Sequence, residues 1–187
     1  MANVLGGLVW ELDGDAFLTS KPVWVRKAVL YPAAADNLAI FRYWGPQSSN
    51  TTARASMLKK SCAVTDTTTI TSSGNFEADE AVAGDIINIH YSDSKNTGYW
   101  QIGTVNSDDA IVVDTGLAAW GESGGVLANE TGKTYSWDIW QPEIAFKLSC
   151  YDANKPYEID FGEKGFKFPN LAMDTLTASA KVYLYLR

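Results

Sequence analysis

The chain has 187 residues, of which 46% are hydrophobic and 12% aromatic, and its formal net charge is −7. A chain of this length buries about 70% of its unfolded surface, enough for one domain or a domain with a small insertion, and its aromatic content excludes a disordered chain. Because Lys and Arg form no stripe or cluster along the sequence, neither nucleic acid nor an anionic membrane surface is an expected partner.

The opening stretch, MANVLGGLVWELDGD, has a short apolar run that no basic residue precedes. The run is far shorter than the ~20 residues of a membrane span, and it lacks the basic region of a secretory signal. We therefore expect synthesis in the cytoplasm, where Cys62 and Cys150 stay reduced.

The first long strand is predicted in KPVWVRKAVLYP, where polar and apolar residues alternate and a proline stands at each end. With NLAIFRYWG it is expected to form a hairpin over residues 23–44. Strict alternation divides the first strand into two faces, one with Val23, Val25, Lys27, Val29 and Tyr31, and the other with Trp24, Arg26, Ala28 and Leu30.

A short helix is predicted over residues 53–60, within NTTARASMLKKSCAV. From residue 65 the sequence becomes a series of short strands separated by Gly, Asn, Asp and Ser turns. Such a series without helices indicates a small antiparallel barrel or sandwich. We interpret residues 65–115 as an inserted β-barrel-like module.

Long strands return after residue 115 and end in ASAKVYLYLR. There Val182, Leu184 and Leu186 share one face, while Lys181, Tyr183, Tyr185 and Arg187 share the other. We predict an all-β protein in which residues 1–64 and 116–187 form a discontinuous antiparallel β-sandwich of the jelly-roll or immunoglobulin-like type.

Candidate catalytic residues are few. His90, the one histidine, ends a predicted strand, which is typical of a surface or structural residue. GESGG around Ser123 is similar to the nucleophile motif of chymotrypsin-like proteases, with Asp108 or Asp109 between it and His90 in the chain. A serine triad needs groups that converge from separate strands, whereas these lie within one short segment. We therefore predict no catalytic residues and a protein that is not an enzyme.

Carboxylate pairs occur at Asp13 with Asp15, at Asp79 with Glu80, and at Asp108 with Asp109. Each pair lies in a predicted turn, which indicates solvated turn residues. Asp13 and Asp15 offer oxygen ligands to Ca²⁺, but the spaced ligands of an EF-hand loop are missing. Zinc-ligand spacings and nucleotide-binding motifs are also missing, so no metal or cofactor is expected.

The seven tryptophans exceed what a core of this size needs. Tryptophan and tyrosine on an outer face suit protein interfaces or stacking on sugar rings. The residues that we expect at such an interface are Trp44, Trp120, Trp140, Tyr183 and Tyr185.

The segments KPVWVRKAVLYPAAADNLAIFRYWG and FKFPNLAMDTLTASAKVYLYLR together resemble small all-β virion proteins of tailed bacteriophages. The central FEADEAVAGDIINIHYSDSKNTGYWQIGTVNSDDAIVVD is similar to a small β-module often inserted in phage structural proteins. The resemblance implies a capsid-associated protein, with a decoration or cement protein as the first choice, and supplies no catalytic or metal residues.

The expected partners are then the major capsid protein or other virion proteins, together with further copies of the chain, as a trimer. The expected location is the outside of the virion shell, because an acidic protein is unsuited to facing packaged DNA. Two alternatives stay open: a carbohydrate-binding β-sandwich that uses Trp44, Trp120 or Trp140 as stacking platforms, and a neck or tail component.

Overall fold

The computed structural model describes residues 6–19, 21–44, 53–55, 62–72, 81–90, 96–107, 109–113, 127–130 and 134–187. In these ranges the chain forms β-strands without helices, and every strand pairing is antiparallel. The described ranges accordingly contain no helix able to cross a membrane. The prediction of an all-β, antiparallel protein is confirmed for this part of the chain.

The chain divides into two compact units, residues 1–43 with 143–187 and residues 44–142. The second unit is therefore longer at both ends than the predicted insertion, residues 65–115. Strands on either side of it pair with the same sheet as the insertion itself. Alternation reveals a strand but not its partner, which is why the boundary was misplaced.

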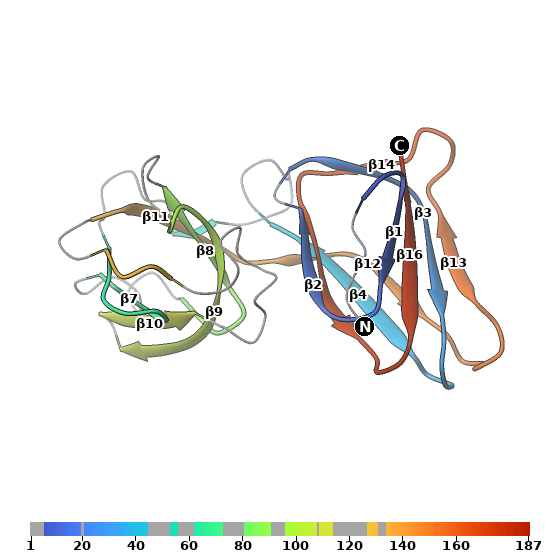
Figure 1. Ribbon diagram of the computed structural model, residues 1–187, viewed down its shortest axis with the longest axis horizontal. Coiled ribbons are helices and arrows are strands. Elements are labelled where there is room, and N and C mark those ends of the chain that lie inside the picture. The colour runs from blue at the N-terminus through green and yellow to red at the C-terminus, as the bar shows by residue number, and fades with distance from the viewer. Residues whose placement is uncertain are drawn as a thin grey trace. The chain divides into compact units, whose positions relative to one another are not determined.

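The first unit contains two antiparallel sheets (Figure 1). The five-stranded sheet has β16 and β3 at its centre and consists of β1 (Val9–Leu12), β16 (Lys181–Leu186), β3 (Val23–Tyr31), β13 (Tyr157–Asp160) and β14 (Phe166–Phe168), the last two both pairing with β3. The four-stranded sheet has the order β12 (Glu143–Ser149), β4 (Leu38–Tyr43), β15 (Leu171–Leu176) and β2 (Ala16–Thr19).

Phenylalanine rings join the two sheets of the first unit. Phe146 of β12 stacks on Phe41 of β4 with ring centroids 4.4 Å apart, and it also contacts Phe168 of β14 at 5.5 Å. Phe41 is fully buried, and Phe146 and Phe168 are nearly so. Each buried ring contributes about 1.5–3 kcal/mol relative to exposure, so this cluster is a main source of the unit's stability.

A β-bulge in β3 changes which side chains face the core. Tyr185 pairs with Lys27, but the next residue, Leu186, pairs with Val25, so Arg26 is the extra residue on β3. Val25 is buried before the bulge, and Ala28 and Leu30 are buried after it. The predicted strict alternation is therefore wrong across this strand, because one inserted residue reverses the parity of all later positions.

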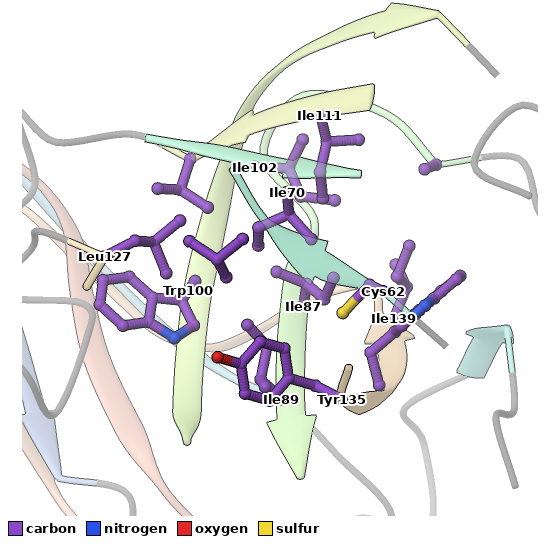
Figure 2. Packing of buried hydrophobic residues seen from close by; sticks show 14 residues of the cluster. Cys62, Ile70, Ile87, Ile89, Trp100, Ile102, Ile111, Leu127, Tyr135 and Ile139 are labelled. Carbon is purple, nitrogen blue, oxygen red and sulfur yellow. The ribbon is translucent and has the colours of Figure 1, made fainter. Parts of the chain in front are cut away.

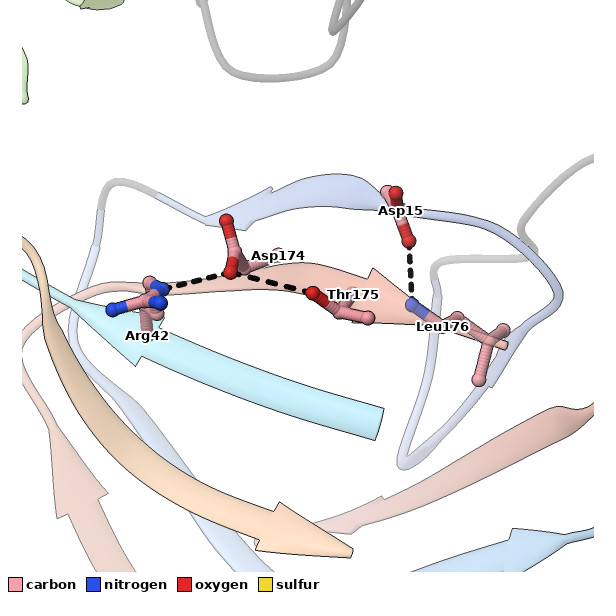
Figure 3. A network of polar contacts seen from close by, with 5 residues as sticks. All are labelled: Asp15, Arg42, Asp174, Thr175 and Leu176. Carbon is pink, nitrogen blue, oxygen red and sulfur yellow. Dashed lines mark hydrogen bonds and ion pairs between the residues drawn. The ribbon is translucent and has the colours of Figure 1, made fainter. Parts of the chain in front are cut away.

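Two further bulges flank β4 at the same place. Between its pairs with Phe41 and Arg42, β12 carries Ala145 as an extra residue, and between its pairs with Phe41 and Ile40, β15 carries Asp174. The carboxylate of Asp174 accepts a hydrogen bond from Arg42 Nε at 2.8 Å and one from Thr175 Oγ1 at 3.4 Å (Figure 3). The bulge on β15 thus places an acidic side chain beside the arginine of the neighbouring strand.

The second unit is one curved sheet with the order β5 (Ala53–Ala55), β11 (Ser136–Trp140), β8 (Ile86–His90), β9 (Gly98–Ser107), β10 (Ala110–Val113), β7 (Thr69–Thr71) and β6 (Ala63–Val64). The segments just before β6 and β11 meet where Cys62 and Tyr135 exchange backbone hydrogen bonds of 2.9 and 2.8 Å. This pairing partly closes the sheet as in a barrel. Residues 53–55 are a strand rather than the start of the predicted helix, and residues 56–60 lie outside the described ranges.

Inward side chains of the curved sheet form its core (Figure 2). Ile87 and Ile89 of β8 lie beside Trp137 and Ile139 of β11, all four fully buried. Trp100 of β9 completes this group and donates its indole hydrogen bond to the main chain of Asn96 at 2.9 Å. Period-two patterning of β8, β9 and β11 therefore produces this core.

Candidate interaction surface

The histidine at the end of β8 contacts a carboxylate that was not part of the protease-like hypothesis. His90 is exposed, and its Nε2 lies 2.8 Å from a carboxylate oxygen of Asp138 on β11 and 3.1 Å from Asn88. Ser123 and Asp108 lie outside the described residues. The acidic partner of His90 is Asp138, which the sequence analysis did not select because the pairing of β8 with β11 was not foreseen.

One of the two candidate calcium ligands, Asp15, is a hydrogen-bond acceptor for the backbone. Asp15 accepts a hydrogen bond from the amide of Leu176 at 2.6 Å (Figure 3). Among the described residues, no three His, Cys, Asp or Glu side chains are grouped so as to hold a metal ion. Asp79 and Glu80 are not described.

Both cysteines are buried free thiols. Burial raises the pKa of Cys62 to about 12, so this thiol stays protonated and unreactive at neutral pH.

Two of the three tryptophans predicted at the interface are buried. Trp44 is 0% exposed and contacts Tyr99 edge-on at 5.5 Å. Trp140 is 8% exposed, and its indole N–H donates to Asp138 at 2.7 Å. Neither ring presents a face to solvent, so the prediction of an exposed surface is wrong for both. Trp120 lies outside the described residues.

The two predicted tyrosines do lie on an outward face. Along β16, Val182 and Leu184 are buried, whereas Tyr183 is half-buried and Tyr185 is 37% exposed. The neighbouring strands add Val9 of β1 and Tyr31 of β3, which are 43% and 45% exposed. We call this surface, made by Leu8, Val9, Tyr31, Tyr183 and Tyr185, the tyrosine face.

The strand register explains how residues from three distant segments gather there. Val9 lies opposite Tyr185, and Tyr185 lies opposite Lys27. The bulge at Arg26 gives Lys27 and Tyr31 the same outward parity as Tyr185 and Tyr183. Without it, the tyrosine of β3 would point toward the four-stranded sheet.

Ion pairs border the tyrosine face on both sides. Lys181 Nζ lies 2.5 Å from Glu11 on β1, and Lys27 Nζ lies 2.6 Å from Glu158 on β13. The hydrogen bond from Lys181 lowers the pKa of Glu11, while burial is the main cause that raises the pKa of Tyr183, with the Glu11 carboxylate adding to it. The phenol of Tyr183 thus stays protonated beside the Glu11 carboxylate.

A hollow of about 370 Å³ adjoins the tyrosine face beside the bulge. Its walls include Val9 and Tyr185 from the face, the cations of Arg26 and Lys27, and the carboxylate of Asp160. An apolar wall next to charges of both signs suits a polypeptide segment better than a purely apolar ligand.

The exposed tryptophan of the described chain is one that the sequence analysis did not select. Trp24 on β3 is 39% exposed, with Lys167 of β14 and Arg187 lying over its ring at 6.0 and 5.7 Å from the centroid. Cation–π contacts of this kind contribute about 0.5–1 kcal/mol at exposed sites. The alternation placed Trp24 on the face opposite Val23 and Val25 without showing which face is exposed, and the cationic neighbours of the indole come from segments whose pairing was unknown.

Neither a family model nor a curated protein nor a solved structure matches the chain.

Proposed function

We propose that the protein acts by contact, as a structural component of a tailed-bacteriophage virion, and specifically as a decoration or cement protein on the outside of the capsid. The observation that carries the contact function is the tyrosine face: Tyr31 and Tyr185 are exposed on the two central strands of a five-stranded sheet, with exposed Val9 beside them.

The physical chemistry of this face supports binding to another macromolecule. Tyrosine supplies a large apolar ring together with a hydroxyl that hydrogen-bonds at the rim, and such residues dominate the energetics of interfaces. The rings stand on paired strands and Lys181 is held by Glu11, so little conformational entropy is lost on binding. A surface that is ordered before its partner arrives is suited to a permanent assembly.

The virion assignment itself draws on the sequence resemblance and on charge. The partner is proposed to be the major capsid protein, contacted by an oligomer of this chain, with a trimer matching threefold positions of a shell. The net charge of −7 favours the outer surface over contact with packaged DNA. Within this proposal the first unit is a β-sandwich, and the contact of Phe146 with Phe168 between its two sheets supports this. A jelly-roll or immunoglobulin-like strand connectivity stays a prediction.

The carbohydrate-binding alternative loses two of its three stacking platforms, because Trp44 and Trp140 are buried. The neck or tail location belongs to the same structural class, and the experiment below separates it from the capsid.

Immunogold electron microscopy of purified phage particles, with antibody against this chain, tests the location. Label over the whole capsid is expected; label confined to the neck or tail would replace the decoration role by the tail alternative, and unlabelled particles would refute the virion proposal.

The tyrosine face is tested by rebinding purified protein to shells that lack it. Tyr31→Thr combined with Tyr185→Thr should weaken binding at least tenfold, since interface aromatics contribute about 2 kcal/mol each. Tyr151→Thr is the matched control, because Tyr151 is 85% exposed in the connection after β12 and is not part of the tyrosine face. Equal binding by the double variant and the wild type would exclude the tyrosine face as the contact.

A further inference from the structure

We propose that Trp24, Arg26, Lys167 and Arg187, here called the cationic cluster, bind an acidic segment of a partner polypeptide, with its carboxylates held by the cations and its chain lying against the indole.

The cluster is assembled by strand pairing around one exposed ring. Lys167 of β14 lies directly opposite Trp24 of β3, and the backbone N–H of Arg187 donates to the carbonyl of Trp24 at 3.1 Å. Arg26 lies two residues further along β3, on the same side of the strand as Trp24, and is exposed. Three positive side chains from three segments therefore share one outward surface.

The cations of the cluster have no acidic partner among the described residues, as is also true of Lys21, Lys147 and Lys164, but only in the cluster do such cations gather around one exposed ring. Lys27, Arg42, Lys155 and Lys181 each form an ion pair with a carboxylate, at 2.5 to 3.8 Å. Arg26, Lys167 and Arg187 form no ion pair with any described residue, although the protein carries 22 acidic residues. An acidic protein that keeps three neighbouring cations unpaired presents a local site complementary to negative charge.

The contacts with the indole prepare the cluster for carboxylates. A guanidinium that lies over an aromatic ring uses its face for that contact and keeps the N–H donors of its edge free. Carboxylates accept two parallel hydrogen bonds from such an edge. Arg187 lies over the Trp24 ring with its Cζ 5.7 Å from the ring centre, within reach of such a contact.

An acidic polypeptide fits the surroundings better than a nucleic acid. Phosphate backbones require cations repeated along a path, but the hollow that Arg26 borders is also lined by Asp160 and Glu163. A continuous phosphate chain leaving the cluster in that direction would meet these carboxylates. One or two Asp or Glu side chains can bind to the cationic cluster without reaching these carboxylates.

This inference stands apart from the virion proposal, since the cluster is tested with a peptide and needs no capsid. Hexaglutamate is titrated into the full chain at about 20 mM salt, where screening of exposed charges is weak. Calorimetry is expected to show saturable binding that weakens as salt is raised. Arg26→Gln, Lys167→Gln and Arg187→Gln should each weaken it about two- to fivefold, in line with exposed ion pairs.

Lys147→Gln is the matched control: it removes the same charge from an exposed position on β12, outside the cluster. The control is expected to bind hexaglutamate as the wild type does. Trp24→Leu should weaken binding and remove any fluorescence change that accompanies it, which ties the peptide to the indole. Equal loss in the Lys147 variant, absence of saturable binding, or tighter binding of hexathymidylate than of hexaglutamate would each overturn the proposal.

Discussion

Tyr31 and Tyr183 meet edge to face across two neighbouring strands, with ring centroids 5.3 Å apart and ring planes at 82°. They are diagonal neighbours, because Tyr31 lies opposite Lys181 whereas Tyr183 lies opposite Val29. The contact holds both rings upright on the sheet before any partner binds. It depends on the bulge at Arg26, which turns Tyr31 to the outward face.

The coupling between these two rings is measurable by a double-mutant cycle. Tyr31→Leu and Tyr183→Leu are made singly and together, and the free energy of unfolding is taken from urea denaturation. Edge-to-face aromatic pairs contribute about 0.5–1.5 kcal/mol beyond area burial, so a coupling energy of about 0.5 kcal/mol is expected at this half-exposed site. Additive losses would show that the rings stand independently.

Glu11 should stabilise the protein only when it is ionised. The hydrogen bond from Lys181 is the first cause that lowers its pKa from the ordinary 4.5. A carboxylate whose pKa is lowered by folding contributes stability above that ordinary value, and the contribution is lost as the pH falls through the folded-state pKa.

Glu11→Gln is therefore expected to lower the free energy of unfolding at pH 7, and its difference from the wild type should shrink as the pH falls toward 3. Denaturation at both pH values checks this. Glu163→Gln is the control, since Glu163 is an exposed carboxylate without an ion pair among the described residues. A loss in Glu11→Gln that persists unchanged at pH 3 would contradict the explanation.

Asp15 should behave in the opposite way. Burial is the first cause that raises its pKa above 3.8, Asp174 adds to the rise, and the amide of Leu176 opposes it. A carboxyl with a raised folded-state pKa favours folding when protonated, so its contribution is lost as the pH rises from below 3.8 through the folded-state pKa. Asp15→Asn keeps an oxygen acceptor for Leu176 and removes the charge.

The Asp15→Asn variant is expected to be at least as stable as the wild type at pH 7, and any advantage should disappear near pH 3. Chemical denaturation at the two pH values is again the measurement. Asp15→Ala is the control for the hydrogen bond, since it removes charge and acceptor together and should be less stable than Asp15→Asn. The explanation would be contradicted if Asp15→Asn were less stable than the wild type at pH 7 and this deficit disappeared at pH 3.

In the second unit, Asn96 holds a separate segment of the chain in place. Its fully buried side chain donates to the carbonyl of Ala128 at 2.7 Å and accepts from the amide of Ala128 at 2.7 Å. Asn96→Ala leaves both groups without these partners, which costs about 1–3 kcal/mol. Hydrogen exchange should show faster exchange at Ala128, while amides of the first unit, such as Leu184, stay protected; unchanged exchange at Ala128 would contradict this role.

Several features of the fold could be predicted from local pattern alone. The alternation in KVYLYL placed Tyr183 and Tyr185 outward, and both lie on the outward side of β16. The same period-two rule identified β3 as a strand but gave wrong faces beyond Arg26, because a bulge leaves no clear mark in composition. One residue of register decided whether Tyr31 belonged to the surface or to the core.

The features that escaped prediction depend on which strands become neighbours. The sequence gives no sign that Asp138 would lie beside His90, or that Lys167 would lie beside Trp24, since these pairs are set by β11 with β8 and by β14 with β3. Trp44 and Trp140 were expected at the surface, yet neighbouring side chains cover both rings. Outward parity in a strand does not ensure exposure when other segments lie over the sheet.

Gly165 shows a close approach of backbone to backbone that only glycine permits. Its φ is +70°, and a Cβ added there would lie 2.9 Å from the carbonyl oxygen of Val25. Gly162 has φ +80°, but an added Cβ would meet nothing within 4 Å. The two glycines close one turn, in which the N–H of Gly165 donates to the carbonyl of Gly162 at 3.0 Å.

Alanine at either position pays about 1–2 kcal/mol for the left-handed conformation, but Gly165→Ala must in addition push the turn away from β3. We expect Gly165→Ala to lower the free energy of unfolding by more than Gly162→Ala does, as measured by urea denaturation of the two variants side by side. Equal losses of stability in the two variants would show that the turn moves freely and that its contact with Val25 does not hold it against β3.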